Sequence, residues 1–173
     1  MAEAKQMIGF VVGESSFASP LASVHEIVRV PDITPVPDSP AHLVGVMNLR
    51  GRIISVIDLR LCLGITGPER SRHSRIIVTE SGGTTLGLVV DSASNVFRIT
   101  AEQIESPAAL FPTGHASYVT GIAKLGDRLV VLVDLALLLK QAIAGNGRAI
   151  RPATQHETSQ MANGATTPTP GAQ

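Results

Sequence analysis

The chain has 173 residues, enough for one moderately sized domain or two small lobes that share a core. Lysine plus arginine equal aspartate plus glutamate, at 14 each, so no net field attracts nucleic acid or anionic lipid. Aromatic residues make up only 3% of the chain and tryptophan is missing, which argues against a stacking platform for single-stranded nucleic acid.

The start of the chain and its apolar stretches predict a cytoplasmic protein. The first six residues lack the basic flank and apolar run of a secretory signal. The longest apolar stretch, 129–139, is interrupted by Asp134 and is shorter than the roughly 20 residues of a membrane span. The single cysteine, Cys62, cannot form an internal disulfide, which fits a reducing compartment. We therefore expect no direct insertion into a membrane.

Two strands are expected near the N-terminus, at 7–12 and 21–30, joined by a polar turn at 13–16. Pro20 cannot donate a hydrogen bond to a sheet ladder. This region is therefore predicted to lie at a sheet edge or to contain a bulge. A proline-rich segment, 31–40, is then expected to form an extended loop.

A hairpin and a short capped helix are predicted next. The strands are 43–49 and 52–57, and Arg50 with Gly51 forms the turn. Asp58 is placed to cap a helix at 59–63.

The second half of the chain follows the same order of elements. The predicted strands are 75–79, 85–90, 95–99, 118–124 and 128–133, and the predicted helix is 135–144. Thr100 has capping-box spacing to Gln103, and Asp134 is placed to cap the last helix. Strands 52–57 and 128–133 are apolar at nearly every position, which indicates a small closed barrel or burial between lobes.

The chain also repeats its own sequence. Seven pairs recur 76 residues apart, namely Gly45/Gly121, Leu49/Leu125, Arg52/Arg128, Asp58/Asp134, Leu59/Leu135, Leu61/Leu137 and Leu63/Leu139. A weaker echo relates 27–30 to 96–99, at an offset of 69. Two related half-domains of roughly 60 to 70 residues are therefore the first hypothesis. A duplicated, strand-rich unit with little catalytic chemistry favours a binding scaffold.

Several stretches match a known family in order and spacing. They are Gly45-Val46-Met47-Asn48-Leu49-Arg50-Gly51, Asp58-Leu59-Arg60, Gly87-Leu88-Val89-Val90-Asp91, Thr100-Ala101-Glu102-Gln103-Ile104 and residues 121–128. Together they resemble the CheW family of bacterial chemotaxis coupling proteins, over about residues 7–140. The resemblance implies an all-β fold with short helices. It would consist of two tandem five-stranded small β-barrels of the Src-homology-3 type, with one core in each and another between them.

The resemblance also implies a function. The family has no known catalysis and bridges transmembrane chemoreceptors to the histidine kinase CheA. The expected partners are the regulatory domain of a CheA-type kinase, which docks through the ends of the barrels, and the cytoplasmic tip of methyl-accepting chemoreceptors, near the groove between the barrels. No cofactor, metal or catalytic residue is expected. Flagellar chemotaxis is the commonest setting, and a pilus or other chemosensory output stays open.

The predicted organisation has three parts. Residues 1–6 form a tail, and 7–144 form the CheW-like domain. Its lobes cover about 7–64 and 75–144, with an exchange of terminal strands between lobes left open. Residues 145–173 are rich in small and polar residues and are predicted to be disordered, because they bury too little apolar surface to offset the entropy of ordering.

Glu26 and Arg50 are predicted to form a structural pair. Alternation along strand 24–30 places Glu26 on one face with Val24, Val28 and Val30, where a carboxylate needs a partner. In the family the matching residues form a salt bridge. Removing one member of a buried pair typically costs about 3–5 kcal/mol. The alternative is a bulge that turns Glu26 to solvent and leaves Arg50 an ordinary turn residue.

By analogy with the family, the receptor- or kinase-interface candidates are Val24, Val28, Gly45 and Arg50. Core packing is the alternative role of the two valines. A required positive backbone angle is the alternative role of Gly45. The helix-cap candidates are Asp58, Thr100 and Asp134, and capping accounts for the two aspartates better than a catalytic carboxylate pair does.

Other chemistry finds little support in the sequence. The five histidines are scattered without a cysteine or carboxylate at ligand spacing. No phosphate loop or nucleophile elbow is present. Cys62, within an apolar helix, is expected to be an inert core thiol. Two rival functions remain: a small-barrel nucleic-acid-binding protein, disfavoured by the neutral composition, and a hydrolase assembled from scattered serine, histidine and aspartate residues.

Overall fold

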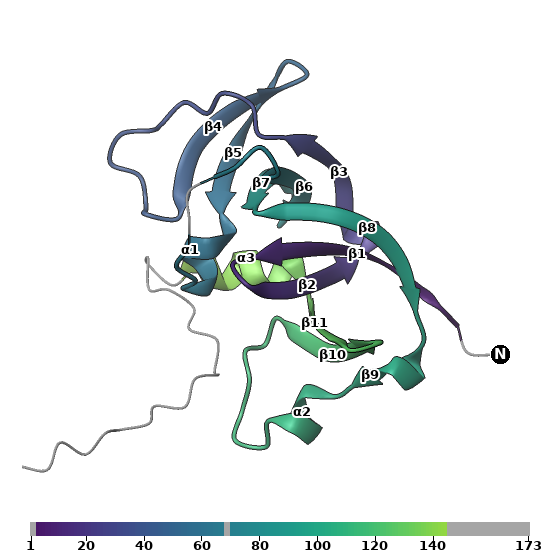
Figure 1. Cartoon of the computed structure of the whole chain (residues 1–173). Helices are drawn as coiled ribbons and strands as arrows, with labels where there is room; N and C mark the ends of the chain where they lie inside the picture. The colour runs from purple at the N-terminus through teal and green to yellow at the C-terminus, as the bar shows by residue number, and fades with distance from the viewer. Residues whose placement is uncertain (1–2, 68–69, 145–173) are drawn as a thin grey trace, which may run out of the picture.

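The structure is a computed structural model that describes residues 3–67 and 70–144, and its strands form two sheets (Figure 1). The predicted disordered tail, 145–173, lies outside the described residues. The first sheet has the strand order β8 (Ser92–Ile99), β1 (Lys5–Val12), β2 (Ser15–Pro20), β11 (Arg128–Val133), β10 (Val119–Leu125) and β9 (Ile104–Glu105). The second sheet has the order β3 (Val24–Arg29), β6 (Arg75–Ser81), β7 (Thr84–Val90), β5 (Arg52–Asp58) and β4 (Leu43–Leu49).

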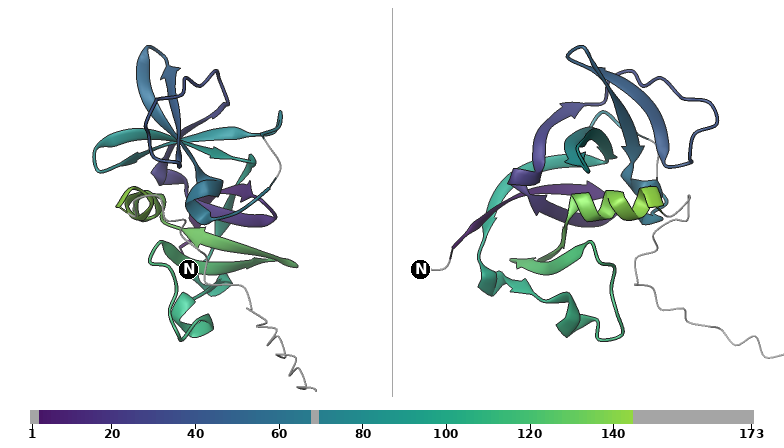
Figure 2. Two further views of the ribbon diagram at one scale, coloured as in Figure 1. Left: turned by 90° about the vertical axis from the view of Figure 1, so that its left-hand side faces the viewer. Right: turned by 180° about the vertical axis from the view of Figure 1, so that it is seen from behind.

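Short helices connect the strands. They are the 3-10 helices η1 (Leu21–Ser23) and η2 (Ala101–Gln103) and the α-helices α1 (Leu59–Leu63), α2 (Pro107–Leu110) and α3 (Leu135–Ala144). In both views of Figure 2, α3 runs along the junction between the two sheets. The predicted fold class, all-β with short helices in two paired β-units, is confirmed. Among the described residues the hydrogen-bonded strand orders are open and do not close into barrels.

The N-terminal region differs from the prediction. The expected strand 21–30 is divided, because 21–23 form η1 and only Val24–Arg29 form β3. The additional strand β2, which contains Pro20, lies inside the first sheet between β1 and β11, whereas β3 lies at the edge of the second sheet and its register shifts between Val24 and Glu26. The expected edge and bulge are therefore found in β3 and not at Pro20. Pro20 is the last residue of β2, where the missing N–H interrupts no further ladder.

The first hairpin of each half of the chain pairs in the sheet of the other half. β1 and β2 join β8, β10 and β11, whereas β6 and β7 join β3, β4 and β5. Each exchanged hairpin is attached by a parallel pairing, β2 to β11 and β7 to β5. The sheets therefore do not coincide with the chain segments 7–64 and 75–144.

Three apolar clusters fill the molecule. One contains residues of the first sheet, including Met7, Ala18 and Leu132. Another contains residues of the second sheet, including Met47, Val56 and Ile76. The third joins both sheets to α1 and α3 through Phe10, Phe17, Leu63, Leu88 and Leu138. The molecule thus has one core within each sheet and a larger one between them.

Candidate interaction surfaces

Glu26 and Arg50 meet at the surface. Arg50 Nη2 donates a hydrogen bond to Glu26 Oε2 at 2.9 Å, so the structure brings together the two residues that the sequence analysis paired. The Arg50 side chain is 79% exposed and that of Glu26 is 26% exposed. The cost expected for breaking a buried pair therefore does not apply here. A solvent-exposed pair contributes about 0–1 kcal/mol.

A bulge in β3 decides which valines share a face with Glu26. Val24 lies opposite Thr79 of β6, and Glu26 lies opposite the neighbouring Val78, so the register shifts between them. Val24 then packs against the core between the sheets, whereas Val28 packs against the core of the second sheet. The expectation that Val24 shares the face of Glu26 is wrong, because the extra residue reverses the alternation.

Arg50 stands at a backbone position that favours glycine. Its φ is 50° and that of Gly51 is 83°, and positive φ at both central residues is typical of a two-residue hairpin turn. Asn48 Oδ1 accepts a hydrogen bond from Gly51 N–H at 2.8 Å. A non-glycine residue in this region is strained by about 1–2 kcal/mol. The turn therefore presents the Arg50 guanidinium to solvent at a cost in stability.

Gly45 is covered by its own chain. Its φ is 154°, and a Cβ at this position would lie 2.2 Å from Thr34 O. Thr34 and Val46 exchange two backbone hydrogen bonds of 2.9 Å, which hold the proline-rich loop against β4. Gly45 is itself buried. Any effect of Gly45 on a partner is therefore transmitted through the position of this loop.

The two main hairpins expose apolar side chains near their turns. Ile53 at the start of β5 is 76% exposed, and Leu129 at the start of β11 is 65% exposed. The two residues are 76 positions apart, so they are equivalent in the repeat. Their exposure was not predicted, because both strands were expected to be buried throughout.

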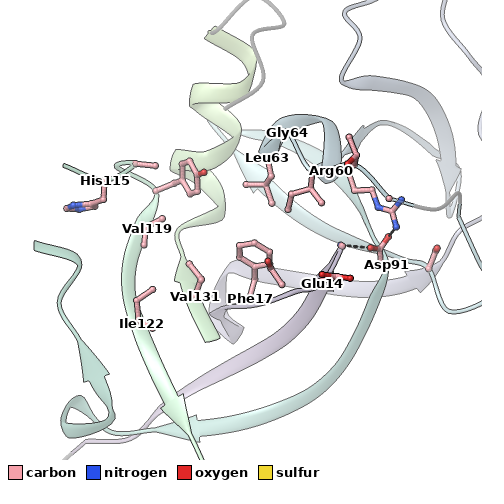
Figure 3. A pocket seen from close by; sticks show the side chains of 18 of the residues that line it. Glu14, Phe17, Arg60, Leu63, Gly64, Asp91, His115, Val119, Ile122 and Val131 are labelled. Carbon is pink, nitrogen blue, oxygen red and sulfur yellow. Dashed lines mark hydrogen bonds and ion pairs between the residues drawn. The ribbon is translucent and has the colours of Figure 1, made fainter. Parts of the chain in front are cut away.

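A cavity of about 960 Å³ opens between the first sheet, α1 and the loops that follow α1 and α2 (Figure 3). Its apolar wall includes Phe17 and Val131 of the first sheet and Leu63 of α1. At the other end lie Arg60 and Asp91, and Figure 3 shows these two side chains meeting there. The cavity therefore combines a wide apolar surface with one polar end.

A polar cluster at that end connects the sheets. Arg60 Nη2 donates a hydrogen bond to Asp91 Oδ1, and Gly13 N–H donates one to Asp91 Oδ2 at 2.6 Å. Arg60 belongs to α1, Gly13 to the turn between β1 and β2, and Asp91 to the connection of β7 with β8. Arg60 and Asp91 both lie in the motifs that resemble the family, but their contact was not predicted. The two residues belong to different connections between strands, and no sequence periodicity relates such positions.

Burial keeps the side chains of the central core protonated. It raises the pKa of the Cys62 thiol from its ordinary value of 9.0 to about 12, with a smaller contribution from the charge of Asp58. Burial, followed by the effect of Cys62, also raises the pKa of Tyr118. Cys62 is buried and unpaired with any other cysteine of the described residues. It behaves as a small apolar residue at neutral pH.

The three predicted cap residues all lie at the start of helical turns. Asp58 Oδ1 accepts a hydrogen bond from Arg60 N–H at 2.9 Å, and Asp134 Oδ1 accepts one from Leu137 N–H at 3.0 Å. At η2, Thr100 N–H donates to Gln103 Oε1 at 2.9 Å. The two aspartates each satisfy a backbone N–H at the start of a helix, and the Gln103 side chain satisfies the backbone N–H of Thr100 at the start of η2.

In residues 3–67 and 70–144, no three or more histidine, cysteine, aspartate or glutamate residues come together as a group that could bind a metal ion. None of the helices in the described part of the chain has the length and apolarity needed to cross a membrane.

The fold and these surfaces define a class of protein, a binding module of two strand-exchanged β-units with equivalent exposed hairpins. The CheW-like domain family matches residues 6–142. The chain is 33% identical over 135 residues to the chemotaxis protein CheW of Klebsiella aerogenes, covering 78% of this chain and 81% of that protein. It is 32% identical over 140 residues to CheW of Helicobacter pylori, covering 80% and 84%.

A solved structure shows the same architecture. The crystal structure of the scaffolding protein TtCheW from Thermoanaerobacter tengcongensis matches with a TM-score of 0.70 and 35% sequence identity. The match covers 80% of this chain and 92% of TtCheW. The chain therefore belongs to the CheW-like domain family, as the resemblance predicted.

Proposed function

We propose that this protein is a chemotaxis adaptor that couples transmembrane chemoreceptors to a CheA-type histidine kinase. The observation that carries the proposal is the match to TtCheW, a scaffolding protein, at 35% identity over 80% of the chain. The relatives named chemotaxis protein CheW support it over a similar span. The role requires binding alone and no chemical step, and residues 7–144 are proposed to perform it in the cytoplasm, held at receptor arrays by the partners.

The two hairpin tips are the proposed kinase-docking surfaces. Ile53 and Leu129 present apolar area that no other part of the described chain covers. Arg52 and Arg128, also exposed, precede them in each repeat. Arginine is enriched at protein interfaces, and an exposed apolar side chain beside it supplies area that a partner can bury. Equivalent tips on two related units also suit a regulatory domain of similar fold, as the family resemblance implies.

The receptor tip is proposed to bind beside β3, at the Glu26–Arg50 pair, while the kinase takes the face of the β4–β5 hairpin that exposes Ile53. The receptor surface contains the exposed Arg50 guanidinium, the partly exposed Val28 on the same side of β3 as Glu26, and the loop whose position depends on Gly45. Val24 lies on the opposite side of β3 and is left out of this surface. The strained turn at Arg50 supports the proposal, because strained backbone positions cluster at functional sites. The helical tip of a receptor would supply a carboxylate for the guanidinium and an apolar side chain for Val28.

Co-purification with the kinase regulatory domain and a receptor tip from the same source tests the proposal. Ile53→Asp or Leu129→Asp should each weaken kinase binding at least about tenfold, because a charge replaces an apolar anchor. Leu110→Asp, on the exposed face of α2, is the matched control and should bind as the wild type does. Wild-type binding by both tip variants would contradict the docking surfaces. Wild-type protein that binds neither partner would leave the family assignment as a statement of fold.

The same experiment identifies the pathway. The kinase and receptor that co-purify decide between flagellar chemotaxis and a pilus or other chemosensory output. A gel-shift assay at low salt addresses the nucleic-acid alternative, because electrostatic binding to nucleic acid is strongest there. No shift is expected for a chain with no net charge.

A further inference from the structure

Asp91 is the centre of the polar contacts between the sheets. Its carboxylate accepts hydrogen bonds from Arg60 of α1 and from the Gly13 N–H of the β1–β2 turn. Its own N–H donates to Val11 O at 2.9 Å. The exposed fractions of the Arg60 and Asp91 side chains are low, so water competes little for these contacts. One carboxylate thus joins the β1–β2 turn of the first sheet to the helix that follows β5 of the second.

The packing around this cluster is incomplete. A second cavity of about 600 Å³ adjoins the first, and Arg60, Asp91, Ile65, Thr66 and Gly67 line both. An open cavity offers no packed side chains whose dispersion contacts would hold its walls in place. Apolar burial elsewhere in the junction attracts the sheets but has little directional preference. On this side of the junction, the hydrogen bonds of Asp91 therefore determine how the sheets are oriented.

We infer that Arg60 and Asp91 are positioning residues that fix the orientation of the two sheets and hence the angle between the two hairpin tips. The inference deepens the proposed function and rests on it, since the tips are the proposed docking surfaces. The β4–β5 and β10–β11 tips belong to different sheets and lie far apart in Figure 1. A strand of seven residues spans about 23 Å, so a rotation of about 10° at the junction moves a tip by roughly 4 Å.

The distance between the tips can be measured directly. Spin labels at Arg52→Cys, the exposed first residue of β5, and Asp127→Cys, in the exposed β10–β11 turn, report the distribution of distances by pulsed electron resonance. Cys62 should remain unlabelled, because it is buried and its thiol pKa is raised to about 12. Asp91→Asn and Arg60→Gln should broaden the distribution or shift it by several Å. Arg60→Lys should restore most of the wild-type distribution, because it retains the cation.

The control is Glu80→Gln, which removes a charge from an exposed pair with His25 and touches neither side of the junction. It should leave the distance unchanged. Arg60→Gln removes the cation that holds the Asp91 carboxylate against the Gly13 N–H. Hydrogen exchange at the Gly13 amide should therefore rise about 10- to 100-fold, which corresponds to the loss of one hydrogen bond to a charged group. Melting curves show whether each variant folds, and Arg60→Gln decides the matter if Asp91→Asn does not fold. Wild-type distances and exchange in the folded variants would overturn the inference.

A functional assay then separates this inference from the proposed function. The variants should bind the kinase domain and the receptor tip singly with wild-type affinity, but should lose most of the receptor-dependent change in kinase activity. Full coupling despite altered distances would overturn the positioning role. If the wild type binds neither partner, the proposed function fails, while the distance and exchange measurements still decide whether Arg60 and Asp91 orient the sheets.

Discussion

The β4–β5–α1 and β10–β11–α3 segments are two versions of one module. Their hydrogen bonds repeat at the offset of 76: Asp58 N–H donates to His42 O, and Asp134 N–H donates to Tyr118 O. The register shifts also repeat, between Leu43 and Gly45 in one and between Val119 and Gly121 in the other. The backbone framework has therefore been kept while the side chains around it have diverged.

The differences lie at the covered glycine and at the tip. Gly45 is overlaid by the backbone of Thr34, whereas Gly121 faces the side chain of Ile104. The left-handed position of the turn is Arg50 in the first module and Gly126 in the second. A duplicated framework thus supports two unlike surfaces. Paired substitutions at equivalent sites test this interpretation.

The largest difference is expected between the two glycines. Gly45→Ala should destabilise the protein by about 3 kcal/mol or more, since it adds backbone strain to a contact with a carbonyl that cannot move aside. Gly121→Ala should cost about 1–2 kcal/mol, because the added Cβ would lie 2.6 Å from a methyl group of the Ile104 side chain, which can move aside. Chemical denaturation of both variants measures the difference. Equal losses would show that the loop over Gly45 adapts as easily as a side chain.

The next effect concerns pH, because Cys62 of α1 corresponds to Leu138 of α3. A thiol whose pKa is raised from 9.0 to about 12 on folding contributes stability that is complete below pH 9 and is lost as the pH rises toward 12. The free energy of unfolding should fall by about 2 kcal/mol between pH 9 and 10.5. Urea titrations at both values, with Cys62→Ala compared to wild type, should show a smaller decline in the variant. A parallel decline would assign the effect to Tyr118 and other groups.

Much of the framework was predictable from sequence because its signals are local. Turn residues, alternation and caps identified the hairpins 43–57 and 118–133 and the helices that follow them. The division of 21–30 was not predictable, because Leu21–Ser23 is a single short turn with no side-chain cap. The exchange of hairpins between sheets depends on the parallel pairing of β2 with β11, and such long-range pairing leaves no periodic trace in the sequence.

The candidate surfaces were less predictable than the fold. The family resemblance suggested the contact of Glu26 with Arg50. Neither a motif nor the alternation of residues predicted that the Arg50 side chain would be exposed to solvent. The exposed Ile53 and Leu129 look like core residues in sequence, because hydrophobicity alone does not show which face of a strand end is left uncovered. The cluster of Arg60, Asp91 and Gly13 needs three connections to converge, which only the folded structure shows.

The two helix caps should have moderate and similar effects. Asp58→Ala and Asp134→Ala should each lower the free energy of unfolding by about 1 kcal/mol, because each leaves a helix N–H without its acceptor. Asp58→Asn and Asp134→Asn serve as controls that retain an acceptor oxygen, and they should recover most of the loss. Denaturant titrations at neutral pH measure all four variants. A much larger loss for Asp58→Ala would mean that the short α1 depends on its cap more than the ten-residue α3 does.

The smallest effect on stability is expected where the modules differ most in chemistry. Arg50→Gly gives the first turn the glycine that the second turn has at Gly126. It relieves about 1 kcal/mol of strain from the left-handed backbone and removes the exposed Glu26–Arg50 pair, worth about 0–1 kcal/mol. The free energy of unfolding should therefore stay within about 1 kcal/mol of wild type. If the guanidinium is there for docking, receptor binding should nevertheless fall, and Gly126→Ala, at the equivalent turn, should spare it. Unchanged receptor binding by a stably folded Arg50→Gly variant would remove Arg50 from the proposed interface, leaving it a tolerated strain in the turn.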